Sequence, residues 1–300
     1  MALAGKVRAL FPCLMDMPPL PPPLPTSGKN RLWIVLVAGA ALCVVVFAVL
    51  IYAGFTTFQR VKQKAETARE ARSQFEKATA EERQKMADMI ENGDTTGGDA
   101  SLGRVKDQLE KSAASMKGAD AGTMRALAVV TGKMQADLKG YEAVLARVTE
   151  VELFRFNIRD KATLAAHRQM VGEFLASNKQ LTETLKNGGE LVRSELDKAG
   201  VSPKMRDATV AGFVSSQQKM RPLQMRIRGA DQVLGDSALS ILDLLEKNWG
   251  KWKIDDASGA PVFNDDSTLE AYNAHIEKIQ AAAADQTEAQ GELVRLMRAK

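Results

Sequence analysis

The longest apolar run in the chain extends from Leu32 to Phe55 and contains no charged side chain. A helix rises about 1.5 Å per residue, so this run can cross a hydrocarbon layer about 30 Å thick. Trp33 near its start and Tyr52 near its end are amphipathic residues of the kind favoured at the headgroup level. The pattern predicts one transmembrane helix over 32–55, with the lipid bilayer as its partner.

Behind this run, apolar residues recur at steps of three and four over much of 56–300, which is the period of a helix with one buried face. The clearest case runs from Thr123 to Phe156. A short turn at 157–160 then leads into a matching helix from Lys161 to Lys186. Because the connection is short, we expect the two helices to be antiparallel neighbours in an elongated bundle.

Glycines and prolines mark where the other helices end. Pro222 lacks a backbone donor and is expected to kink a long helix over 203–248. Ser267 and Glu270 form a capping box at the start of the last helix. The further predicted helices cover 57–91, 102–116 and 268–298, and a segment ending at 199–200.

The predicted fold is therefore mainly α, with a single N-terminal transmembrane helix, a soluble bundle over 56–300 and one small β-hairpin. The hairpin is expected over about 249–264, where two short apolar runs flank a turn. Residues 1–31 hold seven of the ten prolines and predict an extended, disordered tail. This tail is either a docking motif or a stiff spacer, and a third alternative is a translation start at Met15 or Met17.

The apolar run is too long for a cleaved signal peptide, and Leu42 before Cys43 does not fit lipoprotein processing. We therefore expect an uncleaved anchor in the inner membrane. The basic residues behind it outnumber those before it, which favours a cytoplasmic body. A long cysteine-free helical body behind one anchor is, however, typical of exported bacterial proteins. We expect a periplasmic body and leave the orientation open.

Charge and cysteine content exclude several classes of function. Outside the tail, the chain carries 37 basic and 36 acidic residues, after four and one are subtracted from 41 and 37. This balance gives no basis for binding nucleic acid. Both cysteines, Cys13 and Cys43, precede the body, so the body has neither disulfides nor thiolate metal ligands.

No catalytic or cofactor motif is present. The two histidines, His167 and His275, lie on different predicted helices, and the chain has no phosphate-binding loop and no zinc-protease or nucleophile-elbow motif. We expect no enzyme activity, no cofactor and no metal site.

Polar residues interrupt the apolar faces of two predicted helices. A buried polar group must be paired, so these residues either bind a small solute in a polar pocket or pair with one another and fix the helix register. A third possibility is that they face solvent because the assigned face is wrong by one position. The residues are His167, Asn178, Gln217, Gln224 and Asp231.

A basic cluster on the same long helix is a candidate contact for an anionic ligand or lipid headgroup, although such clusters are often solvated helix faces. Its members are Arg221, Arg226 and Arg228. The hairpin is a candidate contact for the membrane surface or a partner, or alternatively a cap over the end of the bundle core. Its candidate residues are Trp249, Lys251, Trp252 and Lys253.

These features favour a non-catalytic, membrane-anchored interaction or scaffold protein of the bacterial cell envelope, with a protein partner or self-association. The alternative is an extracytoplasmic solute-binding or sensory module that uses the polar layer between helices.

Overall fold

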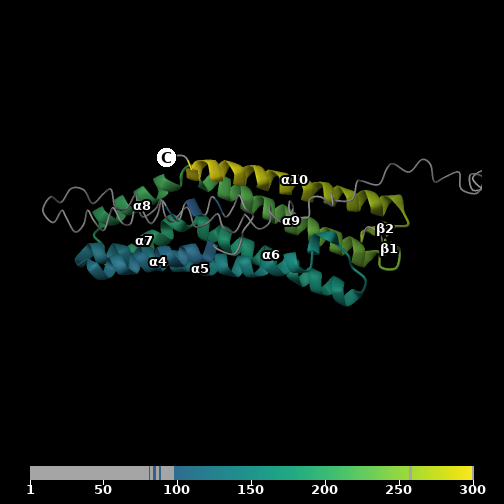
Figure 1. Cartoon of the computed structure of the whole chain (residues 1–300), viewed down its shortest axis with the longest axis horizontal. Helices are drawn as coiled ribbons and strands as arrows, with labels where there is room; N and C mark the ends of the chain where they lie inside the picture. The colour runs from purple at the N-terminus through teal and green to yellow at the C-terminus, as the bar shows by residue number, and fades with distance from the viewer. Residues whose placement is uncertain (1–80, 82–83, 86–87, 89–97, 257–258, 299–300) are drawn as a thin grey trace, which may run out of the picture.

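The computed structural model describes residues 81, 84–85, 88, 98–256 and 259–298. Within these residues the chain forms seven α-helices and one two-stranded antiparallel sheet. The helices run along one long axis, so the body is elongated (Figure 1). The predicted mainly α body with one small hairpin is confirmed.

The predicted tail over 1–31 and transmembrane helix over 32–55 lie outside the described residues, as does nearly all of the predicted helix over 57–91. Among the helices that the structure describes, none is both long and apolar enough to cross a membrane.

The first described helix pair is α4 (Gly98–Ser115) and α5 (Gly118–Glu150), which pack against each other. Gly118 has φ +65°, a conformation that glycine adopts without steric cost, and it makes the turn between them. The helix α5 starts at Gly118, five residues before the predicted Thr123, and Gly122 lies within it. A Cβ at Gly122 would lie 3.2 Å from the backbone oxygen of Ala199, so a glycine allows close packing at this point.

The end of α5 corrects the predicted helix over 123–156. The helix stops at Glu150, and a short 3-10 turn, η4 (Leu153–Arg155), follows. Glu152 and Phe156 on either side of η4 have φ 47° and 52°, in the left-handed region. This turn brings apolar side chains into the core instead of continuing the helix; the buried residues are Leu153, Phe154, Phe156 and Ile158.

The next helix, α6 (Lys161–Lys186), has the predicted bounds. Asp160 caps its start, because its Oδ1 accepts a hydrogen bond from the backbone N–H of Thr163 at 2.6 Å. Its apolar face packs against α5 and is buried; the residues are Leu164, Val171, Phe174, Leu181 and Leu185. Complete burial of one such side chain stabilises the fold by about 1.5–3 kcal/mol.

The long helix predicted over 203–248 is two helices, α8 (Pro203–Gln217) and α9 (Arg221–Lys247). Pro222 lies in the first turn of α9, where its missing donor costs least, so the helix restarts at the proline rather than bending around it. The shorter α7 (Gly188–Lys198) precedes α8, and Gly200, two residues after its end, has φ +66°.

The hairpin consists of β1 (Trp252–Ile254) and β2 (Pro261–Phe263), with Trp252 opposite Phe263. The last helix, α10 (Asp266–Arg298), follows. The predicted capping box at Ser267 is wrong. The cap is Asp265, whose Oδ1 accepts hydrogen bonds from the backbone N–H of Thr268 and from the Ser267 hydroxyl, both at 2.8 Å.

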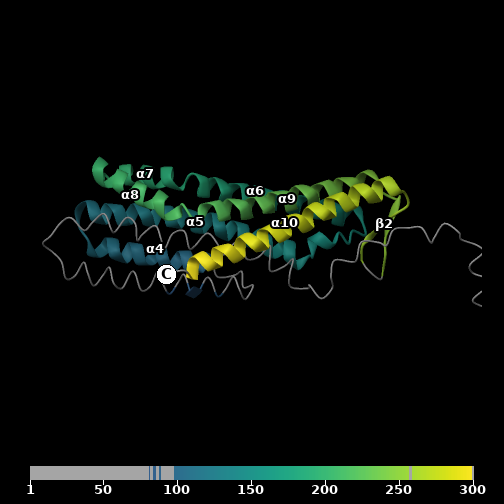
Figure 2. The same cartoon turned by 90° about the horizontal axis from the view of Figure 1, so that it is seen from above.

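Neighbouring helices form a chain of contacts, from α4 to α5, α5 to α6 and α7, α6 to α9, and α9 to α10. Figure 2 shows α10 running beside α9. One continuous apolar cluster fills the interior. The arrangement places the middle of α9 between α6 and α10, and polar groups gather there.

Candidate functional site

A buried polar cluster surrounds Asp231 in the middle of α9. Its side chain is fully buried. Asp231 Oδ2 accepts a hydrogen bond from the hydroxyl of Tyr141 on α5 at 3.0 Å. Asp231 Oδ1 accepts one from the side-chain amide of Gln286 on α10 at 2.8 Å. One carboxylate therefore joins three helices.

Arg228, one turn earlier on α9, completes this cluster. Its Nη2 lies 2.9 Å from Asp231 Oδ2, and its guanidinium carbon lies 4.4 Å from the centre of the Tyr141 ring. The backbone oxygen of Arg228 accepts a hydrogen bond from Asn178 on α6 at 3.0 Å. We call Tyr141, Asn178, Arg228, Asp231 and Gln286 the polar layer.

The polar layer is arranged for an ionised carboxylate. Burial raises the pKa of Asp231 to about 6, while the charge of Arg228 and the hydrogen bonds from Tyr141 and Gln286 act to lower it. Burial also raises the pKa of Tyr141 well above its ordinary value, so its hydroxyl stays a donor. Tyr141 and Gln286 donate hydrogen bonds to Asp231, and Arg228 forms an ion pair with it.

Two oxygens of the polar layer have no hydrogen-bond partner among the described residues. They are Asn178 Oδ1 and Gln286 Oε1. In each of these side-chain amides, the nitrogen donates a hydrogen bond within the layer. A buried carbonyl oxygen without a partner is uncommon and is a place where a water or a solute atom fits.

The five predicted polar residues are all buried, between 0% and 8% exposed. Asn178 and Asp231 lie in the polar layer. Gln224 is buried on α9, and Gln217 lies at the last position of α8. His167 is buried nearer the start of α6, and no hydrogen bond or ion pair between described residues joins it to the polar layer. Burial lowers its pKa.

Tyr141 and Gln286 were not among the predicted site residues. Tyr141 continues the apolar face of α5, and its ring is buried there, so its hydroxyl gave no separate signal. Gln286 follows Ile279 and Ala283 on the buried face of α10. Its position on this otherwise apolar face is the sequence signal that could have identified Gln286 as a site residue.

A buried carboxyl outside this layer also has a shifted pKa. Glu142 on α5 lies next to Asp99 at the start of α4, and burial together with the charge of Asp99 raises its pKa to about 8. A backbone hydrogen bond at Asp99 opposes this shift.

The predicted basic cluster is not one site. Arg228 is buried in the polar layer. Arg226 lies near carboxylates of α10, at 2.7 Å from Asp285 and 3.6 Å from Glu292. Arg221 donates to the backbone oxygen of Lys186 at 2.8 Å. Because the three side chains contact different partners, the structure does not bring them together around an anion.

The hairpin residues divide into packed rings and exposed cations. Trp249 and Trp252 are half-buried and in edge-to-face contact, with ring centres 5.3 Å apart. The indole nitrogen of Trp252 donates to the backbone oxygen of Leu245 at 2.8 Å. Both rings pack on the apolar core, whereas Lys251 and Lys253 are exposed.

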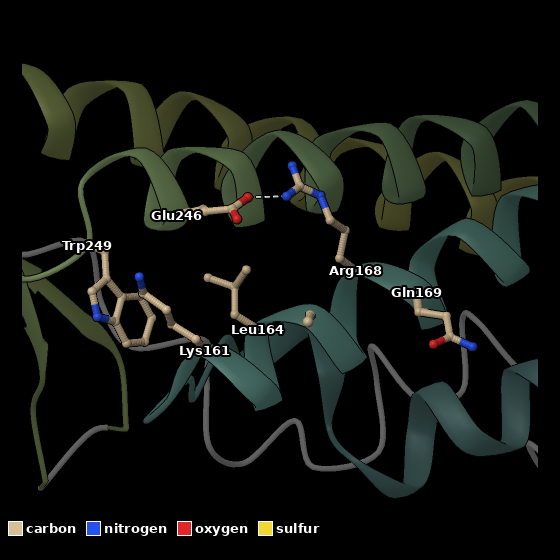
Figure 3. A pocket seen from close by; sticks show the side chains of 7 residues that line it. Lys161, Leu164, Arg168, Gln169, Glu246 and Trp249 are labelled. Atoms are coloured by element: carbon tan, nitrogen blue, oxygen red, sulfur yellow. Dashed lines mark hydrogen bonds and ion pairs between the residues drawn. The ribbon is translucent and has the colours of Figure 1, made fainter.

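A hollow of about 350 Å³ lies between the start of α6 and the end of α9 (Figure 3). Arg168 in it forms ion pairs with Glu246 and Asp243, so its charge is balanced. The Lys161 ammonium lies 5.9 Å from the Trp249 ring centre. The remaining lining residues are Leu164, Ala165 and Gln169, and the predicted polar residues are not among them.

A second hollow, of about 570 Å³, lies at the start of α10. Lys247 and Lys251 line it, but Asp265 also lines it and already accepts the helix N-terminal hydrogen bond. In the part of the chain that the structure describes, no group of three or more His, Cys, Asp or Glu side chains is placed to hold a metal ion.

Comparison with known proteins adds no assignment: the chain matches no family model, no curated protein and no solved structure.

Proposed function

We propose that this protein is a non-catalytic, membrane-anchored interaction or scaffold protein of the bacterial cell envelope. The observation that carries the proposal is the polar layer, where side chains from α5, α9 and α10 pair with one another and Asn178 of α6 donates to the α9 backbone. Asp231 uses both carboxylate oxygens to hold α5 and α10 against α9. Such internal pairing fixes the register of a bundle.

A solute-binding site has a different arrangement. It is usually a concave hollow with a few convergent polar groups that are free to meet the ligand. The two hollows described above are not lined by Asn178, Asp231 or Gln224. The polar groups therefore support a structural use of the buried layer.

Anchoring in the inner membrane is proposed from the apolar run over 32–55. The elongated body leaves long helix faces exposed to solvent, and these are the surfaces proposed to meet a protein partner or a second copy. A periplasmic body remains part of the proposal. The nearly balanced charge of 56–300 supports protein partners rather than nucleic acid.

The second candidate is an extracytoplasmic solute-binding or sensory module. The two amide oxygens without partners, Asn178 Oδ1 and Gln286 Oε1, favour it. A small donor beside either oxygen would satisfy it.

Membrane extraction tests the anchor. After a carbonate wash, the full chain is expected to stay in the membrane, and a variant lacking 32–55 is expected in the supernatant. A variant lacking the proline-rich run 18–25 is the control and is expected to stay. Retention of the variant without 32–55 would contradict the anchor.

Photocrosslinking in intact cells tests the interaction role. A photoreactive amino acid is placed singly at exposed positions of the full chain, namely Val129 on α5, Val214 on α8 and Val233 on α9. The proposal predicts adducts of defined mass at one or more of them. Intact, membrane-located protein without adducts at any of the three would contradict it. Protease digestion of a C-terminal tag in spheroplasts then decides the orientation.

A further inference from the structure

The helical path of the chain breaks twice at the same level of the bundle. The first interruption, at Asn187, separates α6 from α7, and the second, at 218–220, separates α8 from α9. Arg221 at the start of α9 donates to the backbone oxygen of Lys186 at the end of α6, at 2.8 Å. This hydrogen bond places the two interruptions side by side.

The sequence explains each interruption. Pro222 has no N–H to donate to the backbone oxygen one turn earlier, and its ring clashes with that carbonyl, which ends α8. At the other interruption, Asn187 is followed by Gly188 and Gly189, which hold a helix weakly. The last bond of α6 is from Asn187 N–H to Glu183 O, and Leu191 N–H then donates to Asn187 O.

The last helix packs beside the start of α9. Arg226 in the first turns of α9 forms ion pairs with Asp285, Glu288 and Glu292 of α10. Figures 1 and 2 show α7 and α8 continuing past the end of α10. The helices α6 and α9 therefore stop at one plane, while α5 packs on both α6 and α7 and continues through it.

Packing at this plane is tight but incomplete. A Cβ at Gly188 would lie 2.9 Å from Phe213 on α8 and 3.6 Å from Met134 on α5. Gln217 beside it is 3% exposed, and its Nε2 has no hydrogen-bond partner among the described residues. The Gln217 amide nitrogen is thus buried at the interruption between α8 and α9.

The residues of the second interruption are already close to helical geometry. Gln218 has φ −52° and ψ −37°, and Met220 has φ −90° and ψ −35°. Small backbone changes there redirect α8 relative to α9, as in hinges where a few residues at element ends absorb the rotation.

We propose that the paired interruptions at Asn187 and at 218–220 form a hinge, about which the α7–α8 hairpin bends relative to α6, α9 and α10. The helix α5 is the continuous connection between the two parts. The hydrogen bond from Arg221 to Lys186 joins the end of α6 to the start of α9, on one side of the hinge. This inference does not depend on the scaffold role, because it concerns the motion of the chain alone.

Spin-label distance measurements on the full chain test the hinge. Cys13 and Cys43 are the only native cysteines, so a background with Cys13→Ser and Cys43→Ala accepts labels at chosen sites. One label pair, at Val214 and Val233, spans the hinge. The control pair, at Val151 and Val233, lies on one side of it, and all three positions are exposed.

The hinge predicts more than one distance population for the pair that spans it and one narrow population for the control pair. Pro222→Ala restores the missing donor and is expected to reduce the hinge pair to a single population. Pro203→Ala, at the start of α8, makes the same chemical change away from the hinge and is expected to change nothing. A wild-type hinge pair as narrow as the control pair would overturn the proposal, whatever the variants do.

Discussion

Gln286 on α10 donates its side-chain amide to Asp231 on α9 at 2.8 Å, across 55 positions of sequence. Both residues are fully buried. This bond makes α10 part of the same polar layer as α5 and α6. It also gives the last helix a specific register on α9, because a shift by one turn would separate a buried donor from a buried carboxylate.

We expect Gln286→Leu to lower the free energy of unfolding by about 1–3 kcal/mol, because a buried carboxylate oxygen loses its donor. Urea unfolding of the purified chain, followed by circular dichroism, measures it. Gln232→Leu is the matched control. Gln232 is exposed on α9 and, among the described residues, donates to Asp236, so little change is expected. Equal effects of the two variants would contradict a specific role for Gln286.

Asp231→Leu is expected to cost more, about 3–5 kcal/mol, because it leaves the Arg228 guanidinium buried without that carboxylate. Replacing both residues, with Arg228→Met and Asp231→Leu, is expected to recover much of this loss. A double-mutant cycle by chemical unfolding measures the coupling. The control is Arg226→Met, whose ion pairs are exposed and which is expected to cost at most about 1 kcal/mol. Additive losses from Arg228 and Asp231 would show that the two residues are not coupled.

Stability is expected to fall with rising pH where Glu142 titrates. Its pKa is raised from 4.5 to about 8 in the folded chain, so the folded state holds this proton more tightly than the unfolded state. The contribution is complete below pH 4.5 and is lost as pH rises through about 8. The raised pKa of Asp231 also makes the folded chain less stable as pH rises, between pH 3.8 and about 6.

The measurement is the free energy of unfolding against pH for the wild type and for Glu142→Gln. The difference between the two is expected to change steadily across the range from 4.5 to about 8. Glu150→Gln, an exposed substitution on the same helix, is the control. A Glu142→Gln curve parallel to the wild type would show that this carboxyl keeps its ordinary pKa.

Asp265→Ala is expected to destabilise the chain by about 0.5–2 kcal/mol, because the first turn of α10 loses the acceptor of the Thr268 N–H. Ser267→Ala removes only a hydroxyl that donates to Asp265, so a smaller effect is expected. Thermal unfolding of both variants compares them. A larger loss from Ser267→Ala would instead favour the capping box predicted from the sequence.

The order of the helices was largely predictable because helix signals are local. The apolar period of α6, with Asp160 before it and Asn187 after it, lies within one stretch of chain, and its bounds were predicted as they occur. An irregularity near Pro222 was also predictable, because the missing donor belongs to that residue, but the sequence predicted a kink where the structure has a break at 218–220. Burial of Asn178 and Asp231 follows from their positions on apolar faces.

The partners of these polar groups were decided only by the tertiary structure. Asp231 meets Tyr141 and Gln286, at separations of 90 and 55 residues, and these pairings depend on the rotation and relative height of packed helices. Packing likewise ended α5 at Glu150, where the turn that follows buries Phe154 and Phe156. Periodicity along one helix carries no information about the height of its neighbour. The sequence by itself therefore determined which faces are buried, and the tertiary structure determined which buried groups meet.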